Sequence, residues 1–271
     1  MPEGDAVHRA AGRLRGALDG RVLTRSDFRV PRHATADLRG RTVLTTVSRG
    51  KHLLTRVEGG LTVHTHLRMD GSWRIAPAGR RTRNGAVQSP GARGVGGDDV
   101  RLVLANAEWE AVGHRLGMVD LLRTAEESRV VGHLGPDLLG DDWDPAEAVR
   151  RLLLEPDRTI GEALLDQRNL AGIGTIYRAE TLFLRGVWPW RKVGDVADLE
   201  GMVTLAQRLL NANKAHAGTV TTGDRRPGAQ TWVYGRAGRP CRRCGTRISR
   251  GEMGAQPQER LILWCGACQP S

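Results

Sequence analysis

The sequence contains few aromatic residues and very little lysine. Phe, Tyr and Trp make up 4% of its 271 residues, and lysine occurs only as Lys51, Lys192 and Lys214. Arginine supplies nearly all of the positive charge and glycine is abundant, a composition typical of GC-rich coding sequences. A lysine that remains is therefore a stronger candidate for function. The length suggests two domains or one large one, enough to bury a core.

Long apolar runs are also absent. No stretch of 18 apolar residues occurs, which excludes a transmembrane helix. The N-terminus lacks a charged region followed by an apolar segment, so we expect no signal peptide. These absences predict a cytoplasmic protein with no membrane partner.

Cysteine is missing from the first 240 residues. All four cysteines lie near the C-terminus in the pattern C-x2-C-x20-C-x2-C, as Cys241, Cys244, Cys265 and Cys268. Paired C-x2-C motifs in a cytosolic protein are typical of zinc binding rather than of disulfides. Four thiolates leave zinc no open position, so we predict one structural Zn²⁺ with no catalytic role.

Positive charge exceeds negative charge by a wide margin. The net charge is +11 and the pI is about 10.7. Residues 225–271 carry nine Arg against two Glu, a net charge of +7. Such a balance favours a polyanionic partner, and nucleic acid is favoured over a membrane because no strongly amphipathic basic helix is evident. The alternative is an ordinary solvated basic surface.

The first half of the chain has the pattern of a β protein. Short runs rich in Val, Leu and Thr over residues 20–75, and again over 100–122, predict antiparallel strands. Residues 77–99 contain six Gly and no periodicity, which predicts a long mobile loop. We therefore expect an N-terminal domain over residues 1–125, with a helix and a β-sandwich or barrel, followed by a linker over residues 126–143.

The second half changes character at Asp144. Asp144, Pro145 and Glu147 form the pattern of an N-cap, a first helical residue and a capping box. Thr159 and Glu162 repeat that pattern 15 residues later. Both starts predict helices.

Two more helices are expected over about 175–185 and 196–215. The stretch "LLDQRNLAGIGTIYRAETLF" reads as two helices joined by the turn Gly172–Gly174. Such a turn can present free backbone N–H groups of a helix N-terminus to a DNA phosphate, and the alternative is a simple packing turn. We expect a helix–two-turn–helix domain over residues 144–227 and a zinc finger over residues 228–271.

The chain begins "MPEGDAVHRAAGRL". Apolar residues recur at helical spacing, at Val7, Ala10, Ala11, Leu14 and Leu18. Asp5 is expected to cap this helix. Taken alone, the segment is an ordinary helix start with a proline near its first position.

Four motifs together resemble one family. They are the N-terminal "PEG", the lysine in "SRGKHLL", the hairpin "LLDQ…AGIGTIY" and the segment "WVYGRAGRPCRRCGTRI…CGACQ". In this order over the whole chain they resemble the formamidopyrimidine-DNA glycosylase/endonuclease VIII family. Within it, "PEGD" is similar to endonuclease VIII and looks closest to the second actinobacterial form. The resemblance implies an α+β fold with a zinc-bound C-terminal β-hairpin, and a DNA glycosylase and AP lyase of base excision repair.

The resemblance gives the N-terminus a chemical role. After Met1 is removed, Pro2 would offer an α-amine whose pKa near 8 leaves about a tenth of it neutral at pH 7. Such an amine can attack C1′ of a damaged nucleoside and form a Schiff base, followed by β- and δ-elimination. Glu3 would act as the acid that opens the deoxyribose and shuttles protons, and Gly4 would permit a close backbone approach.

Four further residues match family positions. Lys51 and Arg260 correspond to residues that contact the lesion sugar and the flanking phosphates. Met69 corresponds to the residue that fills the gap left by the extruded base, and Leu116 is a weaker second wedge. The alternatives are a solvated lysine, one of many tail arginines, and a core position for Met69.

Three departures from the family pattern bear on the site. Ala6 stands where many relatives have a second glutamate. Thr175 replaces the usual asparagine after Gly174, although its hydroxyl can still reach a phosphate. Gly174 and Thr175 therefore remain candidate DNA-binding residues. The 20-residue spacing between the cysteine pairs is longer than usual, which can displace the tip of the hairpin.

The expected partner is damaged double-stranded DNA, with single-stranded or bubble DNA left open, and the expected state is a monomer. In the family that the chain resembles, the enzymes that remove oxidised guanine cover the extruded purine with a long loop before the zinc unit. The corresponding segment here, from Gly218 to Trp232, spans only fifteen residues, so the resemblance favours oxidised pyrimidines. The rival interpretations are an inactive damaged-DNA-binding protein on the same fold and a zinc-ribbon RNA-binding protein.

Overall fold

The computed structural model describes residues 2–81, 87–88 and 97–271, and for residues 80–81 and 87–88 the backbone alone. The described chain divides into two compact units. The first contains Pro2 and residues 6–133, and the second contains residues 3–5 and 134–271. The change of unit falls within the segment predicted as a linker, residues 126–143, and the domain limits given above stay predictions.

Helix α1 runs from Gly4 to Leu18 and carries the expected apolar stripe into the core of the first unit. With Asp5 as the cap, the helix would begin at Ala6, so it begins two residues earlier than expected. Asp5 therefore lies inside the first turn, where its negative charge suits the helix dipole, and the prediction that it caps the helix is wrong.

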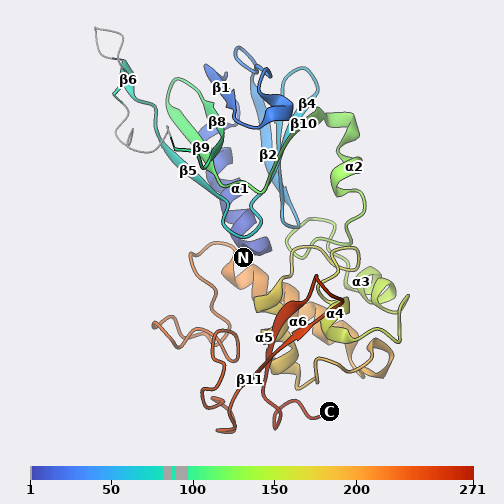
Figure 1. Cartoon of the computed structure of the whole chain (residues 1–271). Helices are drawn as coiled ribbons and strands as arrows, with labels where there is room; N and C mark the ends of the chain where they lie inside the picture. The colour runs from blue at the N-terminus through green and yellow to red at the C-terminus, as the bar shows by residue number, and fades with distance from the viewer. Residues whose placement is uncertain (1, 82–86, 89–96) are drawn as a thin grey trace. The chain divides into compact units, whose positions relative to one another are not determined.

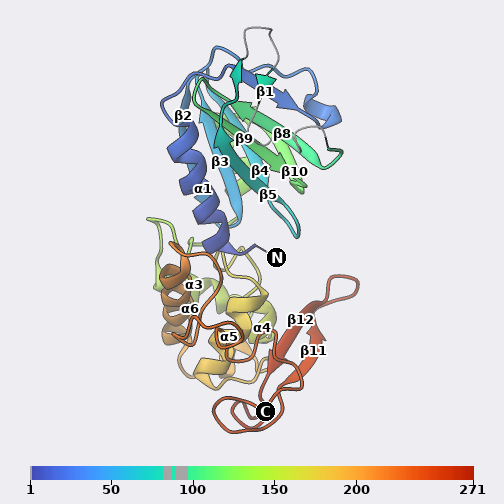
Figure 2. The ribbon, with the colours of Figure 1, turned by 90° about the vertical axis from the view of Figure 1, so that its left-hand side faces the viewer.

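The strands of the first unit form two four-stranded antiparallel sheets (Figures 1 and 2). One sheet has the order β1 (Arg25–Phe28), β8 (Val100–Ala105), β9 (Trp109–His114), β5 (Ser72–Pro77). The other has the order β10 (Met118–Arg123), β4 (Leu61–His66), β3 (His52–Val57), β2 (Val43–Arg49). Buried side chains from both sheets and from α1 share one core, which confirms the expected helix and β-sandwich.

The predicted loop over 77–99 is only partly within the described residues. Two short strands, β6 (Arg80–Arg81) and β7 (Val87–Gln88), pair there, so the segment is not a plain loop. The rest of the prediction, residues 82–86 and 89–96, lies outside the described residues. The unit also contains the short helix α2 (Ser128–Val131) and two 3₁₀ turns, η1 (Pro31–His33) and η2 (Thr124–Glu126).

The second unit is helical, as predicted. Its helices are α3 (Pro145–Leu152), α4 (Ile160–Ala163), α5 (Thr175–Arg185) and α6 (Leu199–Asn213), with the 3₁₀ turn η3 (Val193–Asp195). The N-cap of α3 is confirmed, because the Asp144 carboxylate accepts from the N–H groups of Ala146 and Glu147. The capping box is wrong, since the Glu147 carboxylate pairs with Arg150 and Arg151.

A β-hairpin of β11 (Ser249–Met253) and β12 (Arg260–Trp264) follows the helices. Met253 and Ile262 on one face of the hairpin are buried in the core that the helices form. The hairpin is therefore part of the second unit rather than an independent finger. Within the described part of the chain, every helix is too short or too polar to cross a membrane.

Candidate active site

The carboxylate of Glu3 lies at the N-terminus of helix α5. Its Oε2 accepts hydrogen bonds from the backbone N–H of Gly174 at 2.8 Å and of Tyr177 at 3.3 Å, and its Oε1 accepts from Ile176 at 2.7 Å. Glu3 is 2% exposed. The positive end of the helix and three donors stabilise the negative charge of this buried carboxylate.

This arrangement corrects one expectation. The N–H groups at the turn were expected to be free for a DNA phosphate, but Glu3 occupies three of them. Thr175, the first residue of α5, is 8% exposed. The DNA-binding roles of Gly174 and Thr175 therefore remain predictions, and the turn first serves to hold a side chain of the protein itself.

Glycines make the approach of Glu3 possible. A Cβ on Gly174 would lie 2.7 Å from both Cγ and Oε1 of Glu3, although the backbone angles there suit other residues. The N–H of Gly4 donates to the carbonyl of Gly172 at 2.8 Å, and Gly172 has φ +105°. The expected close backbone approach at Gly4 is present, and its partner is the glycine turn.

The predicted site residues divide between the two units. The first unit contains Pro2, Lys51, Met69 and Leu116. The second contains Glu3, Gly174, Thr175, Arg260 and the four cysteines. The structure brings Glu3 together with Gly174 and Thr175, and Pro2 is joined to this group by its peptide bond to Glu3.

Lys51 lies in the tight turn between β2 and β3, rather than on a strand. It is 9% exposed, so the alternative of a solvated lysine is wrong. It neighbours a cluster of histidines. Burial, followed by the charges of His66, His64, His133 and Lys51, lowers the pKa of His52 to about 3. The charge of Lys51 disfavours a positive charge on His52 and on His66.

The histidines contact one another directly. His52 Nδ1 and His64 Nε2 are 2.9 Å apart, and the ring centroid of His66 lies 4.9 Å from that of His52. Burial, Arg68, Lys51 and His64 lower the pKa of His66 to about 4. Burial also lowers the pKa of His64, against the charges of Asp120 and Glu127. The cluster is therefore uncharged at neutral pH.

Met69 lies at the tip of the turn between β4 and β5 and is 63% exposed. Arg68, with φ +52°, and Gly71 form this tight turn. An exposed apolar tip on a fixed turn is available to a partner, and the alternative of a core methionine is wrong.

Leu116 is 5% exposed and packs in the core of the first unit, so the expectation that it is presented as a second wedge is wrong.

Arg260 begins strand β12 and is exposed. Its position is supported by Arg178, a fully buried residue of α5. The Arg178 guanidinium donates to the carbonyl of Leu261 at 2.5 Å, to that of Arg260 at 3.5 Å and to that of Gly161 at 3.2 Å. Burial lowers the pKa of Arg178 to about 10, so it stays charged at neutral pH.

The four cysteine Sγ atoms lie within 4.8 Å of one another. Cys244 and Cys265 are 3.4 Å apart, and Cys241 and Cys268 are 3.9 Å apart, too far for disulfides. A tetrahedral ion with Zn–S bonds of ~2.3 Å requires sulfurs ~3.8 Å apart. The cluster therefore fits a metal ion bound by four thiolates.

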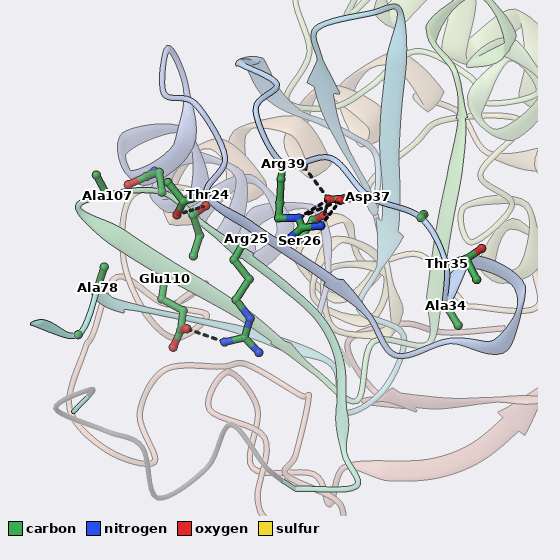
Figure 3. A pocket seen from close by; sticks show the side chains of 14 residues that line it. Thr24, Arg25, Ser26, Ala34, Thr35, Asp37, Arg39, Ala78, Ala107 and Glu110 are labelled. Atoms are coloured by element: carbon green, nitrogen blue, oxygen red, sulfur yellow. Dashed lines mark hydrogen bonds and ion pairs between the residues drawn. The ribbon is translucent and has the colours of Figure 1, made fainter. Parts of the chain in front are cut away.

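A hollow of about 800 Å³ lies elsewhere in the first unit, beside β1 (Figure 3). None of the predicted site residues lines it. Its charged side chains are already paired, Arg25 with Glu110 and Arg39 with Asp37. The hollow offers little charge to a ligand and does not compete with the site at Glu3.

Comparison with known proteins gives the family. The sequence model of the formamidopyrimidine-DNA glycosylase N-terminal domain matches residues 1–109, and that of the formamidopyrimidine-DNA glycosylase H2TH domain matches residues 134–219. The chain therefore belongs to the formamidopyrimidine-DNA glycosylase/endonuclease VIII family, as its motifs predict.

The relatives agree with the resemblance to the second actinobacterial form. The chain is 56% identical to the probable endonuclease 8 2 of Streptomyces coelicolor over 99% of this chain and 94% of that protein. It is 44% identical to the DNA-(apurinic or apyrimidinic site) lyase Nei2 of Mycolicibacterium smegmatis, over 99% of both chains. The predicted family placement is confirmed.

A solved structure shares the fold. The complex between Lactococcus lactis Fpg and an abasic site containing DNA matches with a TM-score of 0.77 and 20% identity, over 99% of this chain and all of that one. At this identity the likeness concerns the fold, and it confirms the predicted fold class.

Sequence reasoning missed the supports of the site. Arg178 and Glu180 are fully buried in α5, and the histidine cluster lies near Lys51. Two charged residues within one turn of a helix that also carries an apolar face were a usable signal, because such residues are rarely buried unless paired. The histidines at alternate positions of "VHTH" were a second signal, because they share one sheet face.

We predict that Gly174→Ala destabilises the second unit. The added Cβ displaces Glu3 and breaks up to three hydrogen bonds, with a cost of about 1–3 kcal/mol. Thermal unfolding should show a lower midpoint for Gly174→Ala. Gly16→Ala in α1 is the matched control, because its Cβ meets nothing within 4 Å. An unchanged midpoint for Gly174→Ala would contradict the packing described here.

We also predict an acid-sensitive stability. The pKa values of His52 and His66 lie below their unfolded value of 6.5, so the unfolded state binds more protons as the pH falls below 6.5. Stability should fall from about pH 6.5 down to about pH 3, the folded-state pKa of His52, and His52→Gln should flatten this fall. The measurement is the unfolding midpoint against pH, with the exposed His216→Gln as control. Parallel curves for wild type and His52→Gln would rule the histidine out.

Proposed function

We propose that this protein is a bifunctional DNA glycosylase and AP lyase that removes oxidised bases, pyrimidines above all, through a Schiff base at Pro2. Membership of the family supports the reaction class, and the relatives named as endonuclease and AP lyase support it further. The observation that carries the proposal is the buried Glu3 carboxylate, which α5 holds one residue from the amine of Pro2. An inactive damage-binding protein would have no use for this arrangement.

The reaction begins at the amine of Pro2. Its neutral nitrogen attacks C1′ of the damaged nucleoside, the C1′–N bond to the base breaks, and the base leaves as an anion that takes a proton from water. The new C–N bond leaves Pro2 as a tertiary ammonium. This ammonium loses its N–H proton far more readily than the free amine would. The loss of this proton needs a base within reach.

Glu3 is that base in the proposed mechanism. Its three N–H partners stabilise the carboxylate, so it accepts a proton before it donates one. The proton from Pro2 then passes to O4′ as the C1′–O4′ bond breaks and the iminium forms. Removal of a C2′ proton expels the 3′ phosphate in β-elimination, and a second elimination releases the sugar.

DNA contacts complete the proposal. Buried Lys51 and exposed Arg260 bind phosphates at and beside the lesion. Met69 enters the stack in place of the extruded base, and its 63% exposure on a tight turn supports this role. The backbone at Gly174 and Thr175 approaches a further phosphate. The expected partner is a damaged duplex.

The cysteine cluster holds one structural Zn²⁺. The four sulfurs fit tetrahedral coordination, which leaves no position for substrate. The ion would join the segment before β11 to the end of β12, and thereby fix the hairpin that carries Arg260. It supplies folding energy and no chemistry.

We predict that the protein forms a covalent adduct with abasic DNA through Pro2. Borohydride should trap the wild-type adduct on a duplex with one abasic site. Pro2→Gly should slow trapping, and a blocked N-terminus should abolish it, because the α-amine is lost. Peptide mapping of the adduct identifies the residue. Undiminished trapping with a blocked N-terminus would assign the nucleophile to a lysine, and no trapping at all would favour the inactive DNA-binding protein.

We predict faster excision of oxidised pyrimidines than of 8-oxoguanine. The fifteen residues from Gly218 to Trp232 provide little cover for a purine, and each unmade base contact costs ~1 kcal/mol. A saturated pyrimidine also unstacks more easily. Single-turnover excision is measured on matched duplexes with thymine glycol, dihydrouracil, 5-hydroxyuracil or 8-oxoguanine. Removal of 8-oxoguanine ahead of every pyrimidine lesion would refute this preference.

A further inference from the structure

The carboxylate of Glu180 is fully buried in helix α5 and accepts four hydrogen bonds from one segment. Its Oε1 accepts from the backbone N–H of Val233 at 2.9 Å and of Tyr234 at 2.8 Å. Its Oε2 accepts from the N–H of Trp232 at 2.8 Å and from the hydroxyl of Thr221. A buried carboxylate with every acceptor position used is a strong and specific attachment.

These donors stand at both ends of residues 221–232, which we call the arm. The two ends also contact each other, since Thr221 N–H donates to the Gln230 carbonyl at 2.8 Å and Trp232 Nε1–H donates to the Thr221 carbonyl at 3.2 Å. Gly223 and residues 225–228 between them are exposed. Glu180 thus closes the base of a loop whose tip is exposed, with the Gly228 carbonyl accepting a hydrogen bond from Arg242.

Neighbouring contacts fasten the arm to the same helix and to the cysteine cluster. Trp232 stacks on Phe183 of α5 with ring centroids 5.6 Å apart. The guanidinium of Arg243, next to Cys244, lies 4.7 Å from the Phe183 ring centroid. Arg242 donates to the carbonyl of Thr231 at 3.1 Å. The arm is therefore held at its base on two sides.

The start of the arm also lies near the N-terminal residues. Burial raises the pKa of Tyr177, as does the charge of Asp5, whereas the hydroxyl of Thr219 lowers it. Thr219 and Asp5 are thus both close to the Tyr177 hydroxyl. The first turn of helix α5 binds the Glu3 carboxylate. Tyr177 lies next along the helix, and Glu180 lies about one turn beyond Tyr177.

We propose that Glu180 is a positioning residue for the lesion base, because it sets where the arm stands relative to Glu3. This rests on the proposed function, in which the segment from Gly218 to Trp232, which contains the arm, is the cover for an extruded pyrimidine. A loosened arm would leave the base poorly covered during excision. Cleavage at a preformed abasic site, which has no base to cover, should not need the arm.

Two substitutions test this. Thr221→Val removes one bond to Glu180 and keeps the side-chain shape, and Glu180→Gln turns one acceptor into a donor that faces N–H groups. Thr181→Val is the matched control, because the buried Thr181 hydroxyl has no hydrogen-bond partner among the described residues. Single-turnover excision of dihydrouracil and cleavage of a preformed abasic duplex are measured side by side, with tryptic cleavage after Arg225 as a readout of arm order.

We expect Thr221→Val to slow excision about tenfold, the equivalent of one hydrogen bond, and Glu180→Gln to slow it more. Abasic cleavage should stay within about twofold, and trypsin should cut both variants faster than Thr181→Val. Equal losses in excision and abasic cleavage would overturn the proposal, as would unchanged excision with a trypsin-sensitive arm. If Glu180→Gln fails to fold, Thr221→Val decides alone. A wild type that cleaves abasic DNA but excises no base would instead refute the proposed function.

Discussion

The hydrogen bonds from the first turn of α5 to the carboxylate of Glu3 are the constraint on which the candidate site depends. They join the third residue of the chain to a helix that begins at residue 175. A buried carboxylate is costly unless its charge is matched. Here the N–H groups at the open end of a helix supply three hydrogen bonds to it, and the charge of Arg178 also acts on it.

The other supports of the site follow the same logic. Arg178 satisfies carbonyl groups of the hairpin that carries Arg260, and Glu180 satisfies N–H groups at the base of the arm. Each is a buried charge that hydrogen-bonds mainly to backbone groups. Such contacts are geometrically strict, because backbone groups cannot move independently of the chain.

Local rules were sufficient where the cause is local. The apolar stripe of α1, the Asp144 cap and the cysteine spacing each predict the element that the structure shows. They fail where a distant residue intervenes. Nothing near Gly174 in the sequence says that Glu3 will fill the turn, and nothing near Leu116 says that the sandwich core will bury it. Sequence motifs predict the chemistry at Pro2 and Glu3, but tertiary packing decides which groups remain available.

Helix α5 also acts as a ruler. Each residue adds about 1.5 Å of rise and about 100° of rotation. The spacing of Arg178, Glu180 and Phe183 therefore sets the position of three attachments along the helix axis and their direction around it. One residue inserted before Glu180 would remove no side chain from the protein, but it would turn the carboxylate away from Trp232. The number of residues along this helix is therefore more tightly constrained than the identity of most of them.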